Sequence, residues 1–264
     1  MSKIINSLFV SGGSITSLYL NDEPNDYDFY LKDKSIADLL IEFYLGKFNE
    51  HNHTKYFWSK EFQAIYKFKK DYHNDLKPSQ ADLYKNWEEL VDVVPAISAH
   101  NLEDKPGCYE PVCITPNAIS LTNNIQIVTR FTGEPEEVIK NFDFVHTNNY
   151  YLFKENKLVT KPEAIESILT KQLIYNGSKF PICSLIRTKK FIERGWKVSA
   201  GEYLKISFQL KHFDLYNIKT LKEQLIGVDA KYFIKFLDML DKADEISEEN
   251  IFNLLNTVFE EVGE

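Results

Sequence analysis

The sequence predicts an α+β protein, in which a mixed β-sheet with a helical insertion is followed by a mainly helical region. Two observations near the N-terminus and in the middle of the chain predict the sheet. Leu8–Val10 is a short apolar run that ends at a Gly-Gly-Ser turn, and the strand-like runs 118–122 and 125–131 flank Asn123–Asn124. An Asn pair at this place favours a two-residue hairpin turn. Beyond residue 160, apolar residues recur at helical spacing, which predicts the helices.

This pattern gives an expected division of the chain into two parts. Residues 1–150 would form the sheet domain, with a helical insertion at about 51–100, and residues 151–264 would form the mainly helical domain. A chain of 264 residues is long enough for one large domain or two small ones.

The composition of the chain limits which partners and which cellular compartment we expect for it. The chain is 44% hydrophobic and 27% charged with a formal net charge of −8, so any contact with RNA or DNA requires a local basic patch. No apolar run approaches the roughly 18 residues of a membrane span, and the N-terminus lacks a signal pattern. The sparse cysteines Cys108, Cys113 and Cys183 predict reduced thiols in the cytoplasm. Abundant Lys, Asn and Ile suggest an AT-rich genome, such as that of a phage or a low-GC bacterium.

The first elements follow from local sequence. Residues 4–10 are expected to form a strand, 14–20 a short helix behind the glycine turn, and 26–32 a second strand after a turn cluster. Ser35 is a candidate N-cap for a helix that runs to about Phe48. Its expected inward stripe consists of Ile36, Leu39, Leu40 and Phe43.

The segment 51–100 combines many aromatic residues with lysines. Its aromatics from Tyr56 to Phe68 are interpreted as the core of an amphipathic helical insertion, and Ser79 would cap a second helix. The alternative is a surface that binds single-stranded nucleic acid by stacking and phosphate pairing.

Two carboxylates and a glycine turn form the strongest candidate site. Asp26 and Asp28 stand at i and i+2 of a strand, so both side chains project from one face. Such close carboxylates repel each other unless a cation neutralises them, and hard oxygen ligands suit Mg²⁺. The turn Gly12-Gly13-Ser14 at the start of a helix can hold phosphate through its backbone N–H groups.

Together these residues resemble the signature of the polymerase-β-like nucleotidyltransferases, in particular the head and neck of bacterial CCA-adding enzymes and poly(A) polymerases. An apolar strand, Gly12-Gly13, a spacer and then Asp26-Tyr27-Asp28 match that signature. The resemblance implies Mg²⁺-dependent transfer of a nucleoside monophosphate from ATP or another triphosphate to an acceptor hydroxyl. By family analogy the first choice of acceptor is an RNA 3′ end, tRNA-like in kind.

The family places a further carboxylate on a neighbouring strand, and here the matching position is Gln126. Gln126 could still bind Mg²⁺ through its carbonyl oxygen, but it brings no charge and cannot act as a base. Arg130 and Lys140 would add positive charge for the phosphates.

Residues 141–150 resemble the family segment that joins the catalytic sheet to the neck and contacts ribose and triphosphate. Asp143, Phe144 and Asn148 match it loosely. Asp143 is then either a third acidic ligand or a structural residue at the hinge. His146 is expected to be a core histidine.

Pro162 and Pro181 each open a predicted helix, and Gly195 ends the second. On that helix Arg187, Lys190 and Arg194 line one face, resembling the family neck helix. Arg187 and Lys190 are candidate phosphate ligands, and all three form a candidate RNA patch whose alternative is a solvated basic face. The family's base-reading Glu-Asp-x-x-Arg element is missing at the expected residues 180–184.

Three alternatives to RNA transfer stay open, one of which is an unrelated interaction protein whose acidic strand is incidental. A nucleotidyltransferase that modifies a protein or a small molecule agrees better with the acidic net charge and the missing base-reading element. A nucleotide-binding relative that has lost catalysis would explain Gln126. The nucleoside triphosphate is a partner in every case except the interaction protein, no membrane contact is expected, and the sequence leaves the oligomeric state open.

Overall fold

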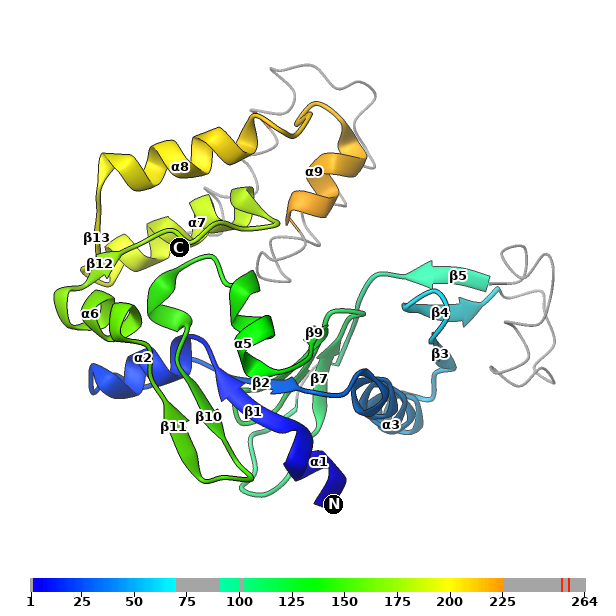
Figure 1. Ribbon diagram of the computed structural model, residues 1–264. Coiled ribbons are helices and arrows are strands. Elements are labelled where there is room, and N and C mark those ends of the chain that lie inside the picture. Colours follow the sequence, from blue (N-terminus) through cyan, green and yellow to red (C-terminus); the bar gives the residue numbers. More distant parts are fainter. Residues whose placement is uncertain (1, 70–90, 100–101, 226–252, 254–255, 257–264) are drawn as a thin grey trace. The chain divides into compact units, whose positions relative to one another are not determined.

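The computed structural model describes residues 2–69, 91–99, 102–225, 253 and 256 (Figure 1). The chain forms two compact units. The first combines Met1–Lys140 with Thr147–Lys161, and the second combines Asn141–His146 with Pro162–Glu264.

An eight-stranded sheet forms the centre of the first unit, in the order β11-β10-β1-β2-β9-β8-β7-β6. The strands are β1 (Leu8–Ser11), β2 (Tyr27–Leu31), β6 (Ile97–Ser98), β7 (Pro111–Ile114), β8 (Ala118–Leu121), β9 (Ile125–Thr132), β10 (Tyr150–Leu152) and β11 (Lys157–Val159). Neighbouring strands are antiparallel except β2 and β9, which are parallel, so the sheet is mixed. The α+β class with a mixed sheet is confirmed.

The first unit also contains helices. They are α1 (Ser2–Ser7), α2 (Gly13–Tyr19), α3 (Lys34–Asn52) and α5 (Pro135–Val138), which a short 3₁₀ turn, η2 (Ile139–Asn141), continues. Helix α2 contacts β1 and β2, and α3 contacts β7 and β9. The main core lies between α3 and the sheet and includes Leu31, Ile41, Ile114, Ile119 and Ile127. Burial of these branched and aliphatic side chains fixes the strands that carry the candidate site.

Two expectations for the N-terminal elements were wrong in detail. Residues 4–7 belong to α1 instead of a strand, because pairing of β1 with both neighbours starts only at Leu8 and Phe9. The N-cap of α3 is Asp33, whose carboxylate accepts a hydrogen bond from the Ser35 N–H at 2.8 Å.

The stripe expected to face inward on α3 is correct at two of its four residues. Ile36 and Leu40 are half-buried and pack against the main core. Leu39 and Phe43 are 58% and 55% exposed, and the most buried positions are instead Ala37, Ile41, Leu45 and Phe48. The sequence holds two overlapping apolar stripes on this helix, so periodicity alone does not choose between them.

The insertion is not helical where the structure describes it. Its described residues form a three-stranded antiparallel sheet of β3 (Tyr56–Ser59), β4 (Ala64–Phe68) and β5 (Val91–Val94), beside α3 in Figure 1. Trp58 and Ile65 join the main core, whereas Phe57 and Tyr66 form a second cluster on the opposite face. Because both faces are buried, the alternation typical of a strand is lost, and the aromatics resemble a helix pattern. The helix expected from Ser79 lies outside the described residues.

The expected hairpin is confirmed, but the expected two-residue turn is wrong. β8 and β9 are antiparallel neighbours, and Leu121 pairs with Ile125, so the loop has three residues, Thr122, Asn123 and Asn124. Asn123 and Asn124 have φ angles of 61° and 57°, a left-handed conformation that Asn tolerates better than most residues.

The second unit is mainly helical. Its described elements are α6 (Pro162–Thr170), β12 (Gln172–Leu173), α7 (Pro181–Glu193), β13 (Lys197–Val198), α8 (Ala200–Leu210) and α9 (Ile218–Leu225). Both predicted proline-initiated helices are confirmed, and Gly195 follows the second with a φ of 81°. The 3₁₀ turn η3 (Val145–Thr147) lies in the segment where the chain passes from the second unit back to the first.

His146 is a core residue of this unit, as predicted. Its side chain is fully buried, and its ring lies 4.4 Å from that of Trp196 and 4.6 Å from that of Phe191. Burial lowers the pKa of His146 to about 4, although the Asp143 carboxylate acts in the opposite direction. The folded protein therefore holds a neutral imidazole at neutral pH.

This burial predicts a stability loss in acid. Below pH 6.5 His146 becomes protonated in the unfolded chain, whereas in the folded chain it stays neutral down to about pH 4. We expect the free energy of unfolding to fall by about 3 kcal/mol across this window because of this one group. His146→Leu should flatten that part of the pH dependence, measured by urea unfolding with Trp fluorescence at several pH values.

The exposed His212 provides a matched control. His212→Leu should leave the pH dependence between 6.5 and 4 as in the unmodified chain. An unchanged slope in His146→Leu would show that other groups cause the acid sensitivity.

Candidate nucleotide and metal site

A glycine turn at the end of β1 forms one side of the site. Gly12 has φ 96° and ψ −152°, a backbone conformation open almost only to glycine, and α2 begins at the next residue. The turn is held by the segment before β10, because Ser11 Oγ donates to the Asn149 carbonyl at 2.7 Å and Gly12 N–H donates to the Thr147 carbonyl at 3.3 Å.

The carboxylate of Asp28 lies directly against this turn. Asp28 Oδ2 is 3.3 Å from the point that a Cβ on Gly12 would occupy. Glycine is therefore required at position 12 for two reasons: its backbone angles, and the space that Asp28 takes. The arrangement brings a negative charge beside the first backbone N–H groups of α2, which have no partner inside the helix.

Gln126 stands beside Asp28 on the neighbouring strand. The parallel pairing of β2 with β9 aligns Asp28 with Gln126, and the antiparallel pairing of β8 with β9 aligns Gln126 with Ser120. Asp26, Gln126 and Ser120 also line one pocket of about 300 Å³. The position that the family resemblance suggested for a further ligand is therefore the one paired with Asp28, and it shares a pocket with Asp26.

Several polar atoms near the glycine turn are buried without a partner. Ser14 Oγ, Asn148 Oδ1 and Asn149 Nδ2 accept or donate no hydrogen bond to any residue that the structure describes. Unsatisfied buried polar atoms are costly, which makes them candidates for contacts to a ligand or to water. Ser14 and Asn148 are both residues that the sequence assigns to nucleotide binding.

The donor atoms present fit a small hard cation. Asp26 and Asp28 offer carboxylate oxygens and Gln126 an amide oxygen, which are the ligand types that Mg²⁺ accepts. Among residues 2–69, 91–99 and 102–225, however, no three His, Cys, Asp or Glu side chains gather as a metal site. A site here would therefore rest on two carboxylates, with Gln126 as the third protein ligand.

Arg130 and Lys140, which the sequence assigns to the phosphates, contact other side chains of the first unit. Arg130 is exposed on β9, donates to Asn117 Oδ1 at 3.2 Å, and lies 5.9 Å from the Phe131 ring centroid. Lys140 is exposed and pairs with Glu137 at 2.6 Å. These pairs are exposed and therefore weak, so a phosphate could displace either one.

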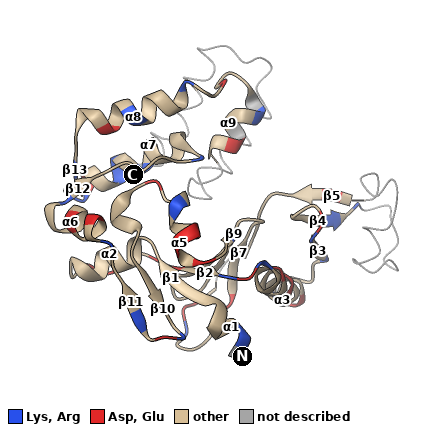
Figure 2. Ribbon diagram, in the orientation of Figure 1, with Lys and Arg blue, Asp and Glu red and all other residues tan. Residues whose placement is uncertain are grey.

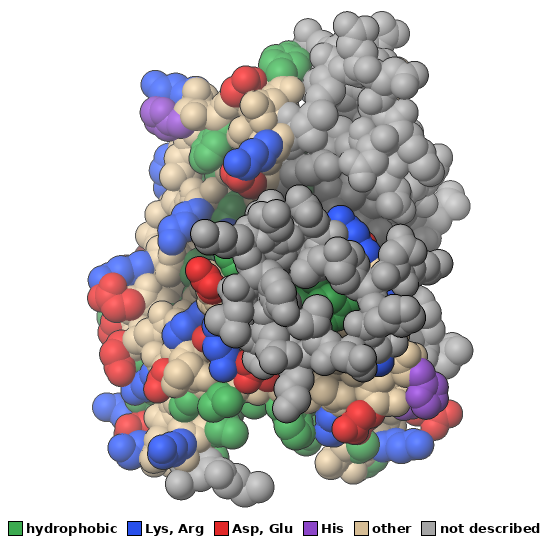
Figure 3. Space-filling model, turned by 90° about the vertical axis from the view of Figure 1, so that its right-hand side faces the viewer, with side chains coloured by type: hydrophobic (Ala, Val, Ile, Leu, Met, Phe, Trp, Pro, Cys, Tyr) green, Lys and Arg blue, Asp and Glu red, His purple; other side chains and the backbone are tan. Residues whose placement is uncertain are grey.

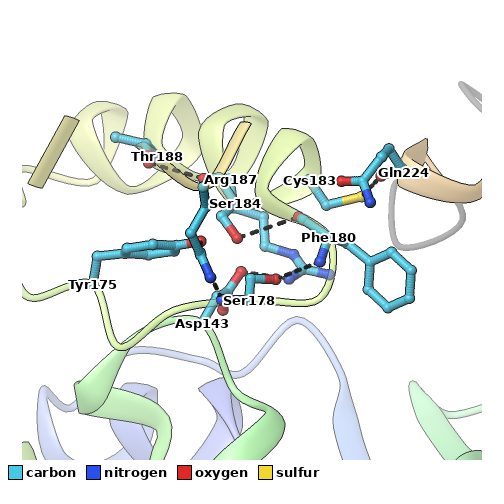
Figure 4. A network of polar contacts seen from close by, with 10 residues as sticks. Asp143, Tyr175, Ser178, Phe180, Cys183, Ser184, Arg187, Thr188 and Gln224 are labelled. Carbon is cyan, nitrogen blue, oxygen red and sulfur yellow. Dashed lines mark hydrogen bonds and ion pairs between the residues drawn. The ribbon is translucent and has the colours of Figure 1, made fainter. Parts of the chain in front are cut away.

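Asp143 and Arg187 belong to the second unit and pair with each other. Arg187 Nη1 donates to Asp143 Oδ2 at 2.6 Å, and the Asp143 side chain is buried while that of Arg187 is 42% exposed (Figure 4). Ser184 and Tyr175 lie beside this pair in the same view. This ion pair is what we expect if Asp143 is a structural residue at the hinge and not a third acidic ligand.

Helix α7 carries the rest of the predicted basic face. Lys190 is half-buried, and Arg194 is exposed at the end of the helix. Figure 2 shows Lys and Arg residues on α7. Acidic and basic side chains alternate over the described surface in the view of Figure 3, so neither sign dominates that face.

One carboxylate at the pocket was not predicted. Asp104 lines the same pocket as Asp26 and Gln126, although it comes from the loop before β7. Nothing in the local sequence marks it, because hydrogen bonds to the distant turn between β8 and β9 hold the loop in place.

No described helix is both long and apolar enough to cross a membrane.

Comparison with solved structures finds enzymes that act on tRNA. A tRNA-processing enzyme with CTP is 13% identical with a TM-score of 0.42, and the match covers 97% of this chain and 54% of that enzyme. A CCA-adding enzyme of Thermotoga maritima with tRNA is 13% identical with a TM-score of 0.39, covering 98% and 55%. A tRNA nucleotidyltransferase with a primer tRNA and an ATP analogue is 12% identical with a TM-score of 0.42, covering 96% and 59%.

Comparison of sequences gives a more specific result. A protein of Bacillus phage SPbetaL7 named Gabija anti-defense 2 is 22% identical over 256 residues, which are 96% of this chain and 48% of the phage protein. The chain thus spans about half the length of this curated relative. The sequence model of the Gabija anti-defense 2 family protein matches residues 2–171, which include the glycine turn, the carboxylate pair and Asn148. This chain therefore belongs to the Gabija anti-defense 2 family.

Proposed function

We propose that this chain is a Mg²⁺-dependent nucleotidyltransferase, which transfers a nucleoside monophosphate from a triphosphate to an acceptor hydroxyl. We further propose that a phage produces it in the cytoplasm of an infected bacterium and that the transfer counters the Gabija defence. The anti-defence role rests on family membership and on the name of the phage relative.

One observation supports transfer more than any other: the Asp28 carboxylate lies against the Gly12 turn and in register with Gln126. A metal-binding carboxylate and a phosphate-binding turn in direct contact are what a metal-bound triphosphate requires. In a merely structural turn, glycine would need only its φ angle, with no charged group in the space of its Cβ.

In this proposal Asp26, Asp28 and the Gln126 carbonyl would hold the metal. Bound Mg²⁺ supplies charge neutralisation at the α-phosphorus and favours ionisation of the attacking hydroxyl. The backbone N–H groups of Gly13 and Ser14, with the buried Ser14 Oγ, would bind the β- and γ-phosphates. Bond formation to the α-phosphorus releases pyrophosphate and one proton.

Further residues have assigned roles in the same proposal. Gly12 keeps the turn open, and Asn148 would bind the ribose through its unpartnered carbonyl oxygen. Arg130 and Lys140 would neutralise phosphate charge after leaving Asn117 and Glu137. Arg187 and Lys190 remain candidates for phosphate or RNA contact, and Asp143 would hold Arg187 in place.

We propose a hydroxyl of a protein of the Gabija defence as the acceptor. Two features favour protein over the RNA 3′ end that fold analogy suggests. The net charge of −8 repels a polyanion, and residues 180–184 at the start of α7 lack the acidic base-reading element. The chain also belongs to a family named for its action against a defence.

The test supplies the protein with Mg²⁺, each α-³²P-labelled triphosphate, and extract from cells that carry Gabija. Label in protein, dependent on Mg²⁺ and absent from Asp28→Asn, is the expected result. Label in RNA would overturn the proposed acceptor but keep the transfer activity. Label in neither fraction would overturn nucleotidyl transfer.

A second candidate function is nucleotide binding without catalysis, which one observation favours. Gln126 occupies the place beside Asp28 where a third carboxylate would stand, and an amide cannot accept a proton. If the chain lacks a base elsewhere at the site, Gln126→Glu should raise the rate of transfer at least about tenfold, since general bases contribute about 10²- to 10⁴-fold. The rate of label incorporation at saturating triphosphate measures the effect.

The exposed Gln172 of the second unit gives a matched control. Gln172→Glu adds the same charge to the chain and should leave the rate unchanged. An unchanged or lower rate in Gln126→Glu would contradict the assignment of position 126 as the site of a missing carboxylate.

A further inference from the structure

A loop of the first unit is fastened to the turn between β8 and β9. Asp104 Oδ1 accepts a hydrogen bond from the Asn123 N–H at 2.6 Å. The Asn123 side chain in return donates to the carbonyls of Lys105 at 3.1 Å and Cys108 at 2.8 Å. Thr122 adds two more bonds, because its Oγ1 donates to the Cys108 carbonyl and accepts from the Glu110 N–H. These bonds fix the position of Asp104 relative to the sheet.

The same turn is joined to the start of β2. The Tyr27 N–H donates to the Asn124 carbonyl at 2.7 Å, so the residue that follows Asp26 is bonded to the residue that follows Asn123. Asp26 and Asp104 therefore both lie beside this turn, Asp104 at Asn123 and Asp26 next to the residue bonded to Asn124. Both line the pocket of about 300 Å³ that also contains Gln126.

Asp104 is suited to contact a second substrate. Its residue is exposed, and within the described part of the chain only the Asn123 N–H engages its carboxylate, through Oδ1. The second oxygen, Oδ2, has no partner there. Apart from Asp26, which the proposal assigns to the metal, the other polar side chains of the pocket are amides and hydroxyls, from Asn25, Asn124, Gln126, Ser120 and Thr122. These groups bind neutral hydroxyls well but do not accept a proton at neutral pH.

We propose that Asp104 is a catalytic residue of the nucleotidyl transfer, in which its carboxylate binds the acceptor hydroxyl and removes its proton. The inference rests on the proposed function. The acceptor oxygen forms a bond to the α-phosphorus, the bond from that phosphorus to the bridging oxygen breaks, and pyrophosphate leaves. The proton passes from the hydroxyl to Asp104 and then to water, so Asp104 ends the cycle as it began.

This role explains the neutral residue at position 126. The base need not stand on the sheet if a loop supplies it at the same pocket. Asp104 is not assigned to the metal, because the described residues contain no group of three acidic, His or Cys side chains with metal-site geometry. A base distinct from the metal ligands is instead consistent with Asp104 being held at Asn123, whereas the residue after Asp26 is bonded to Asn124.

Asp104→Asn tests the proposal, because the amide keeps an oxygen for the Asn123 N–H and removes only the charge. We expect transfer from α-³²P-labelled triphosphate into extract protein or RNA to fall about 10²-fold, in line with the loss of a general base. Binding of Mg²⁺–ATP, measured by calorimetry, and the melting temperature should not change. Glu103→Gln is the matched control, since this exposed neighbour pairs with Lys105 and does not line the pocket.

The outcomes separate the inference from the function on which it rests. Transfer by Asp104→Asn within threefold of the unmodified protein overturns the catalytic role of Asp104 and leaves the proposed function intact. A lower affinity for Mg²⁺–ATP that accounts for the lost transfer also overturns it, in favour of a role at the metal. If the unmodified protein labels neither protein nor RNA, both the proposed function and the role of Asp104 are overturned.

Discussion

Asp28→Asn is expected to abolish detectable nucleotidyl transfer, a loss of at least about 10³-fold, while the protein stays folded. The substitution keeps the shape of the side chain that lies 3.3 Å from the Cβ position of Gly12, but removes its charge. Metal ions stabilise a transferring phosphoryl group by several kcal/mol, and each 1.36 kcal/mol is tenfold in rate. Asp26→Asn should have the same effect, because two carboxylates are the only charges that the proposed metal ligands provide.

Two measurements make this prediction decisive. Transfer of label from α-³²P-labelled triphosphate reports activity, and calorimetry with Mg²⁺–ATP reports whether the metal-bound nucleotide still binds. The melting temperature should change little, since Asp28 is half-buried and Asp26 is exposed. Asp22→Asn is the matched control, because this exposed carboxylate lies in the turn shortly before the pair and does not line the pocket. Retained activity in Asp28→Asn would contradict the site assignment.

The central part of this site could be predicted from the sequence because its geometry is local. A Gly-Gly pair after an apolar run indicates a tight turn, and of the expected pair on the next strand Asp28 lies in β2 while Asp26 directly precedes it. The hairpin was predicted but its register was not, because a two-residue turn would have aligned Ser120 with Ile127 instead of Gln126. That Gln126 aligns with Asp28 follows from the parallel pairing of β2 with β9, a longer-range contact that resemblance to a known family suggested and the structure shows.

The parts that the sequence predicted wrongly depend on tertiary contacts. The strands of the 51–100 insertion bury both faces, so Phe57 and Trp58 are both buried although they are adjacent. The buried face of α3 is chosen by what lies across from it, and Leu39 and Phe43 face away from the core although their spacing is helical. Sequence periodicity reports that an element has an apolar face and does not report which neighbour covers it.

Asp104 shows the same limit at the site itself. It comes from a loop more than seventy residues after Asp28, and its position depends on side-chain bonds that Asn123 and Thr122 make with loop carbonyls. No spacing rule connects these residues. A search of the sequence for a third carboxylate examines the strands, where regular geometry holds, and therefore misses a carboxylate that a loop supplies.

Gly12→Ala is expected to impair both stability and transfer, although it adds one methyl group. Alanine in the backbone conformation of Gly12, with φ 96°, is strained by about 1–3 kcal/mol. Its Cβ would also meet Asp28 Oδ2 at 3.3 Å, closer than ordinary van der Waals contact, so the carboxylate must move. A displacement of about 1 Å at a reacting site can cost 10²-fold in rate, and we expect a loss of transfer of at least that size.

Gly13→Ala and Gly46→Ala are controls for Gly12→Ala, because each adds the same methyl group without the backbone strain. Neither glycine has a positive φ, and a Cβ on either meets nothing within 4 Å. Gly13→Ala should leave the free energy of unfolding unchanged or raise it, since alanine favours a helix by about 1 kcal/mol, and thermal melting measures this. Gly46→Ala, within α3, should in addition leave transfer unchanged.

The cause of the loss in Gly12→Ala can be assigned by combining it with Asp28→Asn. If the alanine methyl acts on the nucleotide by moving Asp28, then the two substitutions lower the affinity for Mg²⁺–ATP by less together than the sum of their separate effects. The backbone strain is independent of the Asp28 charge, so the losses in the free energy of unfolding should add. Additive losses in affinity would instead mean that Gly12 serves the phosphates directly and that its contact with Asp28 is incidental.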